Sequence, residues 1–342
     1  MEKYDVIIIG GGPGGLCCAN SLSRAGAKVV VLERKKTIGA KVCAGGITWD
    51  GLIPKIPDNL IERAFKDQQI FTGRQSFCLR RKNPVIATVN RIRLGQWLTR
   101  QALQAGADIR TGWYVRNLEK DRITATDAKG KTVRLGCGHL VGADGSASLV
   151  RRFLGIPTRR AGIGLNYQVP GYHEHMEWHL NTGFFGNGYG WIFPHRETVS
   201  IGAYGPGTGT VPKKLQHNLI RWAGTRNFAL AEEQGKAELI NYDYRGYDFG
   251  TCWLVGDAAG FASGLTGEGI HPAIISGEAV AGKILDPAYP ADEIRRLLNK
   301  KKRHELLVKL TGRNRISCTL LLETLALMIR LDLVDFQKEL SM

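Results

Sequence analysis

The residues best placed to do chemistry form a glycine-rich turn near the start of the chain. Gly10, Gly12 and Gly15 follow an apolar run at residues 6–9 and occupy the glycine positions of the spacing G-x-G-x-x-G. The first glycine of this pattern permits a tight turn, the second lets backbone approach a pyrophosphate, and the third lets a helix pack on a strand. The pyrophosphate lies at the N-terminus of the helix, where free N–H groups favour an anion. The turn therefore predicts a phosphate site.

An acidic residue follows at the distance that a dinucleotide site requires. The predicted strand over residues 28–32 ends at Glu33, about twenty residues after the turn, where a carboxylate accepts hydrogen bonds from a ribose diol. A glycine-rich turn without a ligand does not explain both the preceding strand and this acid. We predict a dinucleotide site that also includes Pro13, Gly14 and Arg34.

The elements that must position these residues alternate between strands and helices. We expect helices over 14–25, 94–105, 211–224 and 268–285, and a hairpin over 69–89 that turns near Asn83-Pro84. This pattern predicts an α/β fold with a Rossmann-like parallel sheet, discontinuous in sequence, a β-rich substrate domain and a helical C-terminal tail. The boundaries we assign are residues 1–68, 90–155 and 251–285 for the nucleotide domain, 69–89 and 156–250 for the substrate domain, and 286–342 for the tail.

The composition bounds the class of protein and its location. Seven cysteines in 342 residues show no C-x-x-C spacing, which argues against a zinc site, an iron–sulfur cluster or a disulfide framework. The first strand begins near residue 4 and leaves no room for a signal peptide, and the most apolar late run, 318–333, carries three charges. We expect a cytoplasmic protein in a reducing compartment.

The net charge of +16 is large and partly clustered over residues 300–315. Such a segment suits an anionic membrane surface, an acidic substrate or an acidic redox partner, and it is equally consistent with a solvated helix face. Nucleic acid is not expected, because no recognition motif accompanies the charge. We predict a location in the cytoplasm, with peripheral membrane contact as a further possibility.

Two later stretches show a similar pattern, in which a strand or loop leads through a glycine-rich turn into a helix. Residues 254–260 read LVGDAAG, in which Gly256 and Asp257 end a predicted strand, and residues 264–270 read GLTGEGI, which begins a helix. The pairing resembles the glutathione-reductase-type FAD proteins, in the branch with aromatic hydroxylases and geranylgeranyl reductases. The resemblance implies that Asp257 contacts the ribityl chain. It also implies that the helix start, with Gly267, Gly269 and Ile270, faces the N1/C2=O edge of the flavin, where reduced flavin is anionic.

A middle motif and an arginine extend the same resemblance. Residues 142–151 read GADGSASLVR, which is similar to the middle motif of the branch and assigns Asp144 to the cofactor. Arg91 precedes Leu94 by three residues, as an arginine does in that branch, and a surface arginine is its alternative reading. The resemblance implies FAD as the cofactor.

Two further stretches resemble the geranylgeranyl reductases. Residues 41–46 read KVCAGG and residues 189–194 read YGWIFP, whereas members of that family pair Lys-x-Cys-x-Gly-Gly with Tyr-x-Trp-x-Phe-Pro. The chain departs from the family at Gly186, often a proline, and at Tyr204, where a second glycine of G-x-G is usual. The first loop places Lys41, Cys43, Ala44 and Gly45 near the isoalloxazine.

The resemblance implies an FAD-dependent oxidoreductase that reduces carbon–carbon double bonds of a prenyl, geranylgeranyl-type lipid by hydride from flavin N5. An isolated alkene accepts hydride poorly, so a shaped apolar slot and one placed acid are needed. On a strand, Tyr189, Trp191 and Phe193 share one face and wall the slot. Cys43 is the candidate proton donor or positioning group, with Tyr189 second and Trp191 beside them. Core packing is the alternative for each.

Three histidines, His173, His175 and His179, share a strand face in the manner of metal ligands. We expect surface or substrate-phosphate contacts rather than a metal, because the only acids that could complete a site, Glu174 and Glu177, are expected to point the other way. The alternative activities are an FAD monooxygenase or halogenase acting on an aromatic substrate, and the non-enzymatic alternative is a binding protein for prenylated partners. No second G-x-G-x-x-G unit is present for NAD(P)H, so an acidic electron carrier such as ferredoxin is the expected donor.

Overall fold

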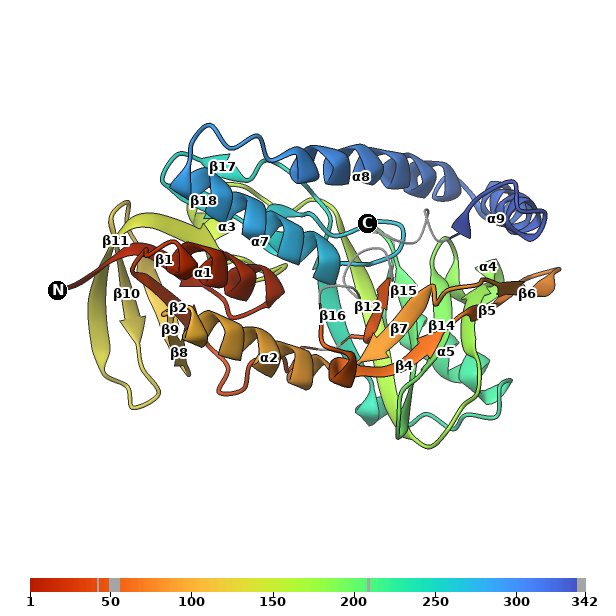
Figure 1. Cartoon of the computed structure of the whole chain (residues 1–342). Helices are drawn as coiled ribbons and strands as arrows, with labels where there is room; N and C mark the ends of the chain where they lie inside the picture. Colours follow the sequence, from red (N-terminus) through yellow and green to blue (C-terminus); the bar gives the residue numbers. More distant parts are fainter. Residues whose placement is uncertain (42, 49–55, 208–209, 337–342) are drawn as a thin grey trace.

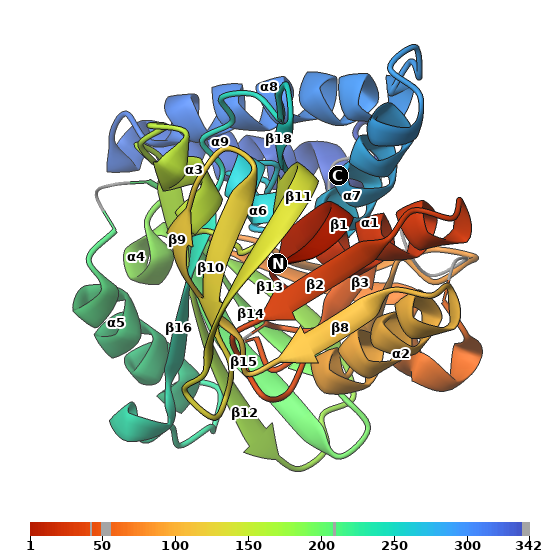
Figure 2. The same cartoon turned by 90° about the vertical axis from the view of Figure 1, so that its left-hand side faces the viewer.

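The computed structural model describes residues 1–41, 43–48, 56–207 and 210–336. Val42, within the KVCAGG motif, and residues 337–342 of the predicted tail lie outside this part. Figures 1 and 2 show two large sheets with the last two long helices along the upper edge of the molecule. No described helix is long and apolar enough to cross a bilayer.

The first sheet is the parallel sheet that the glycine turn predicts. Its order is β17-β18-β11-β1-β2-β8, and β9 and β10 extend from β11 as antiparallel strands. The strands are β1 (Glu2–Ile9), β2 (Val29–Glu33), β8 (Asp108–Thr111), β9 (Tyr114–Leu118), β10 (Arg122–Thr126), β11 (Thr132–Gly142), β17 (Asp248–Phe249) and β18 (Cys252–Leu254).

Strands β1 and β2 are buried on both faces, which is why their sequences are continuous apolar runs. Val6 and Ile8 of β1 pack with α1 (Pro13–Arg24), α2 (Arg91–Gln104) and α7 (Ile270–Leu285). Ile7 and Ile9 face the other side, where β9, β10 and the start of α8 (Asp292–Thr311) cover the sheet. The carboxyl ends of β1, β2 and β18 therefore meet at one edge of a sandwiched sheet, where ligands of such folds bind.

The second sheet carries the aromatic motif. Its order is β16-β12-β15-β14-β13-β5-β6, antiparallel except for the β13–β5 pair. One face packs on α5 (Pro212–Gly224), and the other face is aromatic. The strands are β5 (Asp67–Thr72), β6 (Ser76–Arg80), β12 (Ala161–Pro170), β13 (Met176–Leu180), β14 (Tyr189–Pro194), β15 (Thr198–Gly205) and β16 (Lys236–Asn241).

Smaller elements complete the chain. A three-stranded sheet has the order β3-β7-β4, from β3 (Gly46–Thr48), β7 (Ile86–Val89) and β4 (Ile61–Phe65). The remaining helices are η2 (Asp58–Leu60), α3 (Leu149–Phe153), α4 (Thr182–Phe185), η3 (Glu232–Gln234), α6 (Gly256–Ala259) and α9 (Arg315–Arg330).

Two local predictions are wrong. The hairpin turns between β5 and β6 at residues 73–75, not at Asn83-Pro84, which instead leads from β6 to β7 in another sheet. The helix expected over 94–105 begins three residues earlier, because the Asn90 side chain accepts hydrogen bonds from the backbone N–H groups of Ile92 and Arg93. Arg91 is therefore the first residue of α2.

Candidate functional site

One cavity of about 580 Å³ gathers the predicted site residues from segments far apart in the chain. The glycine turn, the ends of β2 and β18, the start of α7 and the aromatic face of β14 all line it. The residues of the predicted site that line the cavity are Gly10, Gly12, Pro13, Gly14, Glu33, Arg34, Lys41, Cys43, Ala44, Arg91, Asp144, Tyr189, Trp191, Phe193, Gly256, Asp257, Gly267, Gly269 and Ile270. Gly15 and Gly45, also predicted, are not among the lining residues.

The three fingerprint glycines have different structural reasons. Gly10 has φ +107°, and a Cβ there would lie 2.3 Å from the Ala143 carbonyl oxygen. A Cβ on Gly15 would lie 2.2 Å from the Gly10 carbonyl oxygen. On Gly12 the nearest atom of the described residues would be 3.9 Å away, so none of them demands glycine there. Gly10 and Gly15 serve the turn, and Gly12 leaves open space at the N-terminus of α1.

The Glu33 carboxylate connects the end of β2 to the turn. Its Oε2 accepts a hydrogen bond from Gly11 N at 2.8 Å, and its Oε1 accepts one from Lys35 N at 2.8 Å. Both bonds fix the carboxylate at the cavity wall. Contact with a ribose stays a prediction for this residue.

At the other end of the cavity, Asp257 is held by two side chains. Its Oδ2 accepts hydrogen bonds from Lys41 Nζ at 2.9 Å and from Ser146 Oγ at 3.1 Å. The Asp257 carboxylate raises the pKa of Lys41 and keeps it charged. The helix α7 begins beside this pair, and its N-cap Gly269 supplies no side-chain cap. The starts of both α7 and α1 line the cavity, where helix N-termini favour an anion.

Arg91 tests whether this cavity fits an anionic dinucleotide. Its Nε and Nη1 atoms are buried without a hydrogen-bond partner among the described residues. An unpaired buried guanidinium is costly, and a pyrophosphate is the kind of group that satisfies it. Asp144 Oδ1 is a second buried atom without a partner there, and burial raises the pKa of Asp144. With the open space at Gly12, these groups fit the phosphates and sugar hydroxyls of FAD.

Aromatic side chains of β14 form one wall of the cavity, as the alternation in residues 189–194 predicts. Tyr189, Trp191 and Phe193 alternate onto one face, with ring centroids 5.9 Å apart for the first pair and 6.0 Å for the second. Sequence reasoning missed Trp178 on β13, which is the cross-strand partner of Trp191. The ring centroid of Trp178 lies 4.8 Å from that of Phe193. All four rings line the cavity. Its walls are therefore polar at the turn and aromatic at β14.

Tyr204 also went unrecognised as a wall residue, although it stands where the sequence departs from G-x-G. It pairs across the strands with Tyr189. The Tyr204 hydroxyl donates to the Gly264 carbonyl at 3.0 Å, and the Tyr189 hydroxyl donates to the Thr266 carbonyl at 2.5 Å. Both tyrosines thus hold the loop before α7. Burial raises the pKa of Tyr189, which makes this hydroxyl a poor acid and favours a positioning role.

Cys43 lies on a loop that a histidine holds in place. The backbone N–H of Gly45 donates to Cys43 Sγ at 3.4 Å. His195 Nε2 donates to the neighbouring Ala44 carbonyl at 2.9 Å, and its Nδ1 lies 2.5 Å from Glu62 Oε2. Gly45 has φ +75°, and a Cβ there would lie 2.6 Å from His195. His195 directly follows the aromatic motif, and no spacing signal marks it.

The histidine group is built around a carboxylate. The expectation that Glu177 points away is wrong, because positions 177 and 179 share a strand face. His173 Nε2 and His179 Nε2 each lie 2.8 Å from the Glu177 carboxylate, as does Arg226 Nη2. Burial opposes ionisation of Glu177, but these partners keep its pKa below the ordinary value. The described residues contain no group of three or more His, Cys, Asp and Glu side chains suited to a metal.

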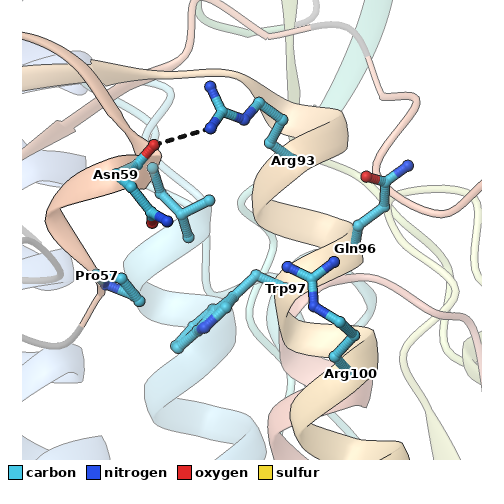
Figure 3. A pocket seen from close by; sticks show the side chains of 7 residues that line it. Pro57, Asn59, Arg93, Gln96, Trp97 and Arg100 are labelled. Carbon is cyan, nitrogen blue, oxygen red and sulfur yellow. Dashed lines mark hydrogen bonds between the residues drawn. The ribbon is translucent and has the colours of Figure 1, made fainter.

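A second cavity, of about 230 Å³, lies between η2 and the outer side of α2 (Figure 3). Arg93 reaches across it to the Asn59 carbonyl at 3.0 Å, beside Trp97 and Arg100. None of the predicted site residues lines it. The larger cavity is therefore the candidate site.

Comparison with known proteins decides the family. Residues 3–169 match the model of an FAD binding domain. Over 311 residues the chain is 31% identical to digeranylgeranylglycerophospholipid reductase 2 of Methanothermobacter thermautotrophicus, covering 82% of this chain and 79% of that protein. The chain belongs to the geranylgeranyl reductase family. As a member of this family of flavoproteins, it is an FAD-dependent oxidoreductase with FAD as its cofactor.

Solved structures confirm the fold expected for a geranylgeranyl reductase family member. A geranylgeranyl bacteriochlorophyll reductase-like protein from Thermoplasma acidophilum superposes with a TM-score of 0.78 at 21% identity, covering 93% of this chain and 90% of its own. A probable FAD-dependent monooxygenase from Pseudomonas aeruginosa gives 0.66 at 17% identity, covering 91% and 95%. Reductases and monooxygenases thus share this architecture, and the fold does not choose between them.

Proposed function

We propose that this protein reduces carbon–carbon double bonds of a prenyl, geranylgeranyl-type lipid. The observation that carries the proposal is the wall of four aromatic rings in the same cavity as the glycine turn that we assign to FAD. Rings in contact with one another form an apolar surface that suits a branched hydrocarbon chain. The relative at 31% identity, whose name describes reduction of a digeranylgeranyl lipid, supports the same substrate class.

The chain's own residues position the substrate and supply a proton. When bound and reduced, FAD supplies a hydride from N5. Alkene reduction also adds one proton to the adjacent carbon, so hydrocarbon and acid must be held together. In this proposal the rings of Trp178, Trp191 and Phe193 exclude water from the prenyl chain of the substrate. Cys43 is our candidate proton donor, because it lines the cavity while the Tyr189 proton is engaged by the Thr266 carbonyl.

The electrons come, in this proposal, from an acidic carrier protein such as ferredoxin. The net charge of +16 attracts such a partner, and association then weakens as salt rises. Rapid NADPH oxidation by the purified protein alone would count against a carrier.

Anaerobic incubation of the dithionite-reduced holoprotein with a panel of geranylgeranyl lipids tests the activity. Mass spectrometry should find products heavier by two hydrogens, or by multiples of two. The matched control is Trp222→Ala, which removes a buried tryptophan of α5, the helix packed on the opposite face of the same sheet. Trp191→Ala should lower turnover more than this control at equal flavin content. Oxygen consumption stimulated by an aromatic substrate, with no reduced lipid, would instead establish a monooxygenase.

A further inference from the structure

The last helix of the described chain presents an apolar face to solvent. One side of α9 is buried through Cys318, Leu322, Ala326 and Ile329. The opposite side carries Ile316, 83% exposed, and further exposed large apolar residues, with Thr324 and Arg330 as exposed polar residues of the same helix. We call this the α9 apolar face, made of the exposed residues Ile316, Leu320, Leu321, Leu327 and Met328 of α9, together with Leu331 and Leu333 just after its end.

This face is unusual for the surface of a soluble helix. A surface helix normally has a polar outer stripe, and a contiguous exposed apolar patch indicates an interaction site. Ile316 and Leu320 lie about one helical turn apart, as do Leu327 and Leu331. Glu323 and Thr324 lie between these two pairs. A helix of this kind lies along a surface, because α9 is too short to cross a bilayer.

Basic residues adjoin the α9 apolar face. Lys302, Arg303 and Lys309 are exposed on α8, and Arg313 and Arg315 are exposed where α8 leads into α9. Figures 1 and 2 both place the two helices along the same edge of the molecule. A second copy of this chain would bring like charges together at this edge. Anionic lipid headgroups would neutralise them while the acyl region receives the apolar side chains.

We propose that the α9 apolar face and the adjoining basic residues dock the protein on an anionic lipid bilayer. The buried side of α9 joins this surface to the cavity. Ile329 and Phe336 belong to the same packed cluster as Trp178 and Phe193 of the aromatic wall, and the Phe336 ring lies 6.0 Å from Trp178. Docking through α9 sets the aromatic end of the cavity toward the membrane. The delivery of a prenyl chain from that membrane rests on the proposed function.

Flotation of the holoprotein with vesicles tests the docking without any turnover. Vesicles of phosphatidylcholine with one quarter phosphatidylglycerol should bind the protein, and pure phosphatidylcholine should bind it less. Leu320→Glu/Leu327→Glu should weaken binding at least tenfold. Leu103→Glu/Leu285→Glu, which places the same charges on exposed leucines of α2 and α7, should bind within twofold of wild type. Lys302→Gln/Arg303→Gln should lose about fivefold per residue at low salt.

Several results would overturn the proposal. Wild-type protein that stays unbound from anionic vesicles refutes it, as does binding equal to wild type in the Leu320→Glu/Leu327→Glu variant. Sedimentation of the wild type and of this variant tests the alternative occupant, a second copy of the chain. A wild-type dimer that the variant dissociates would make the α9 apolar face an interface between copies and would overturn the docking. Vesicle binding in a protein that reduces no prenyl lipid would refute the proposed function and leave the docking intact.

Discussion

Gly12 and Gly15 lie three residues apart, yet alanine at each should damage the protein in different ways. In the part of the chain that the structure describes, a Cβ at Gly12 meets no atom closer than 3.9 Å, and the φ of Gly12, −76°, suits alanine. Gly12→Ala should therefore change the unfolding free energy of the apoprotein by only ~0.5 kcal/mol. The methyl group projects into the space where we place the pyrophosphate. Overpacking of about 1–3 kcal/mol there corresponds to FAD binding weakened about 5- to 150-fold.

Gly15→Ala is the matched control with the opposite signature. Its Cβ would lie 2.2 Å from the Gly10 carbonyl oxygen and 2.9 Å from Ala143 Cβ, so backbone must move before any ligand binds. The apoprotein should lose about 1–3 kcal/mol of stability. Urea unfolding of both apoproteins, with FAD titration followed by flavin fluorescence, separates the two effects. Wild-type FAD affinity in Gly12→Ala, or destabilisation equal to that of Gly15→Ala, would refute the assignment of the pyrophosphate to Gly12.

Three further outcomes follow from the site and its surroundings. Asp257→Ala removes the acceptor of Lys41 and Ser146, and purified protein should carry less FAD by absorbance; normal occupancy would remove Asp257 from the cofactor site. Cys43→Ser should keep the flavin spectrum but slow product formation, and unchanged turnover would make the thiol structural. Burial lowers the pKa of Lys301 to about 8, so the folded state releases its proton before the unfolded state does. Stability of wild type relative to Lys301→Met should rise by ~3 kcal/mol between pH 8 and 10.5, measured by urea unfolding, and parallel curves would contradict this.

Local spacing predicted the parts of the site that one segment makes alone. The glycine turn is local because Gly10 and Gly15 contact each other, and the β14 face is local because alternate side chains share a face. Trp178 is different, since its place in the wall depends on the pairing of β13 with β14. Neither strand's own sequence predicts which strand it pairs with.

The errors have the same physical origin. Asn83-Pro84 is a strong turn signal, but the chain changes sheets there rather than forming a hairpin. His195 reaches Glu62 and Ala44 only because three elements converge. Tyr204 was visible as a departure from a family pattern, and only the packed structure shows that its ring lines the cavity and its hydroxyl holds the loop before α7.

The order of the eight-stranded sheet sets when this protein can first hold its cofactor during synthesis. β1 pairs with β11, β11 pairs with β18, and a Cβ on Gly14 would lie 2.8 Å from the Ala273 carbonyl of α7. The turn at Gly10 leaves the ribosome roughly ten to fifty seconds before α7 does. The strand partners of β1 and β2 are all made by residue 142, but α7 does not yet cover Val6 and Ile8 in that interval. Because α7 forms part of the cavity and packs on Gly14, we expect flavin capture to await this helix, so that retained yellow colour reports a chain made through α7.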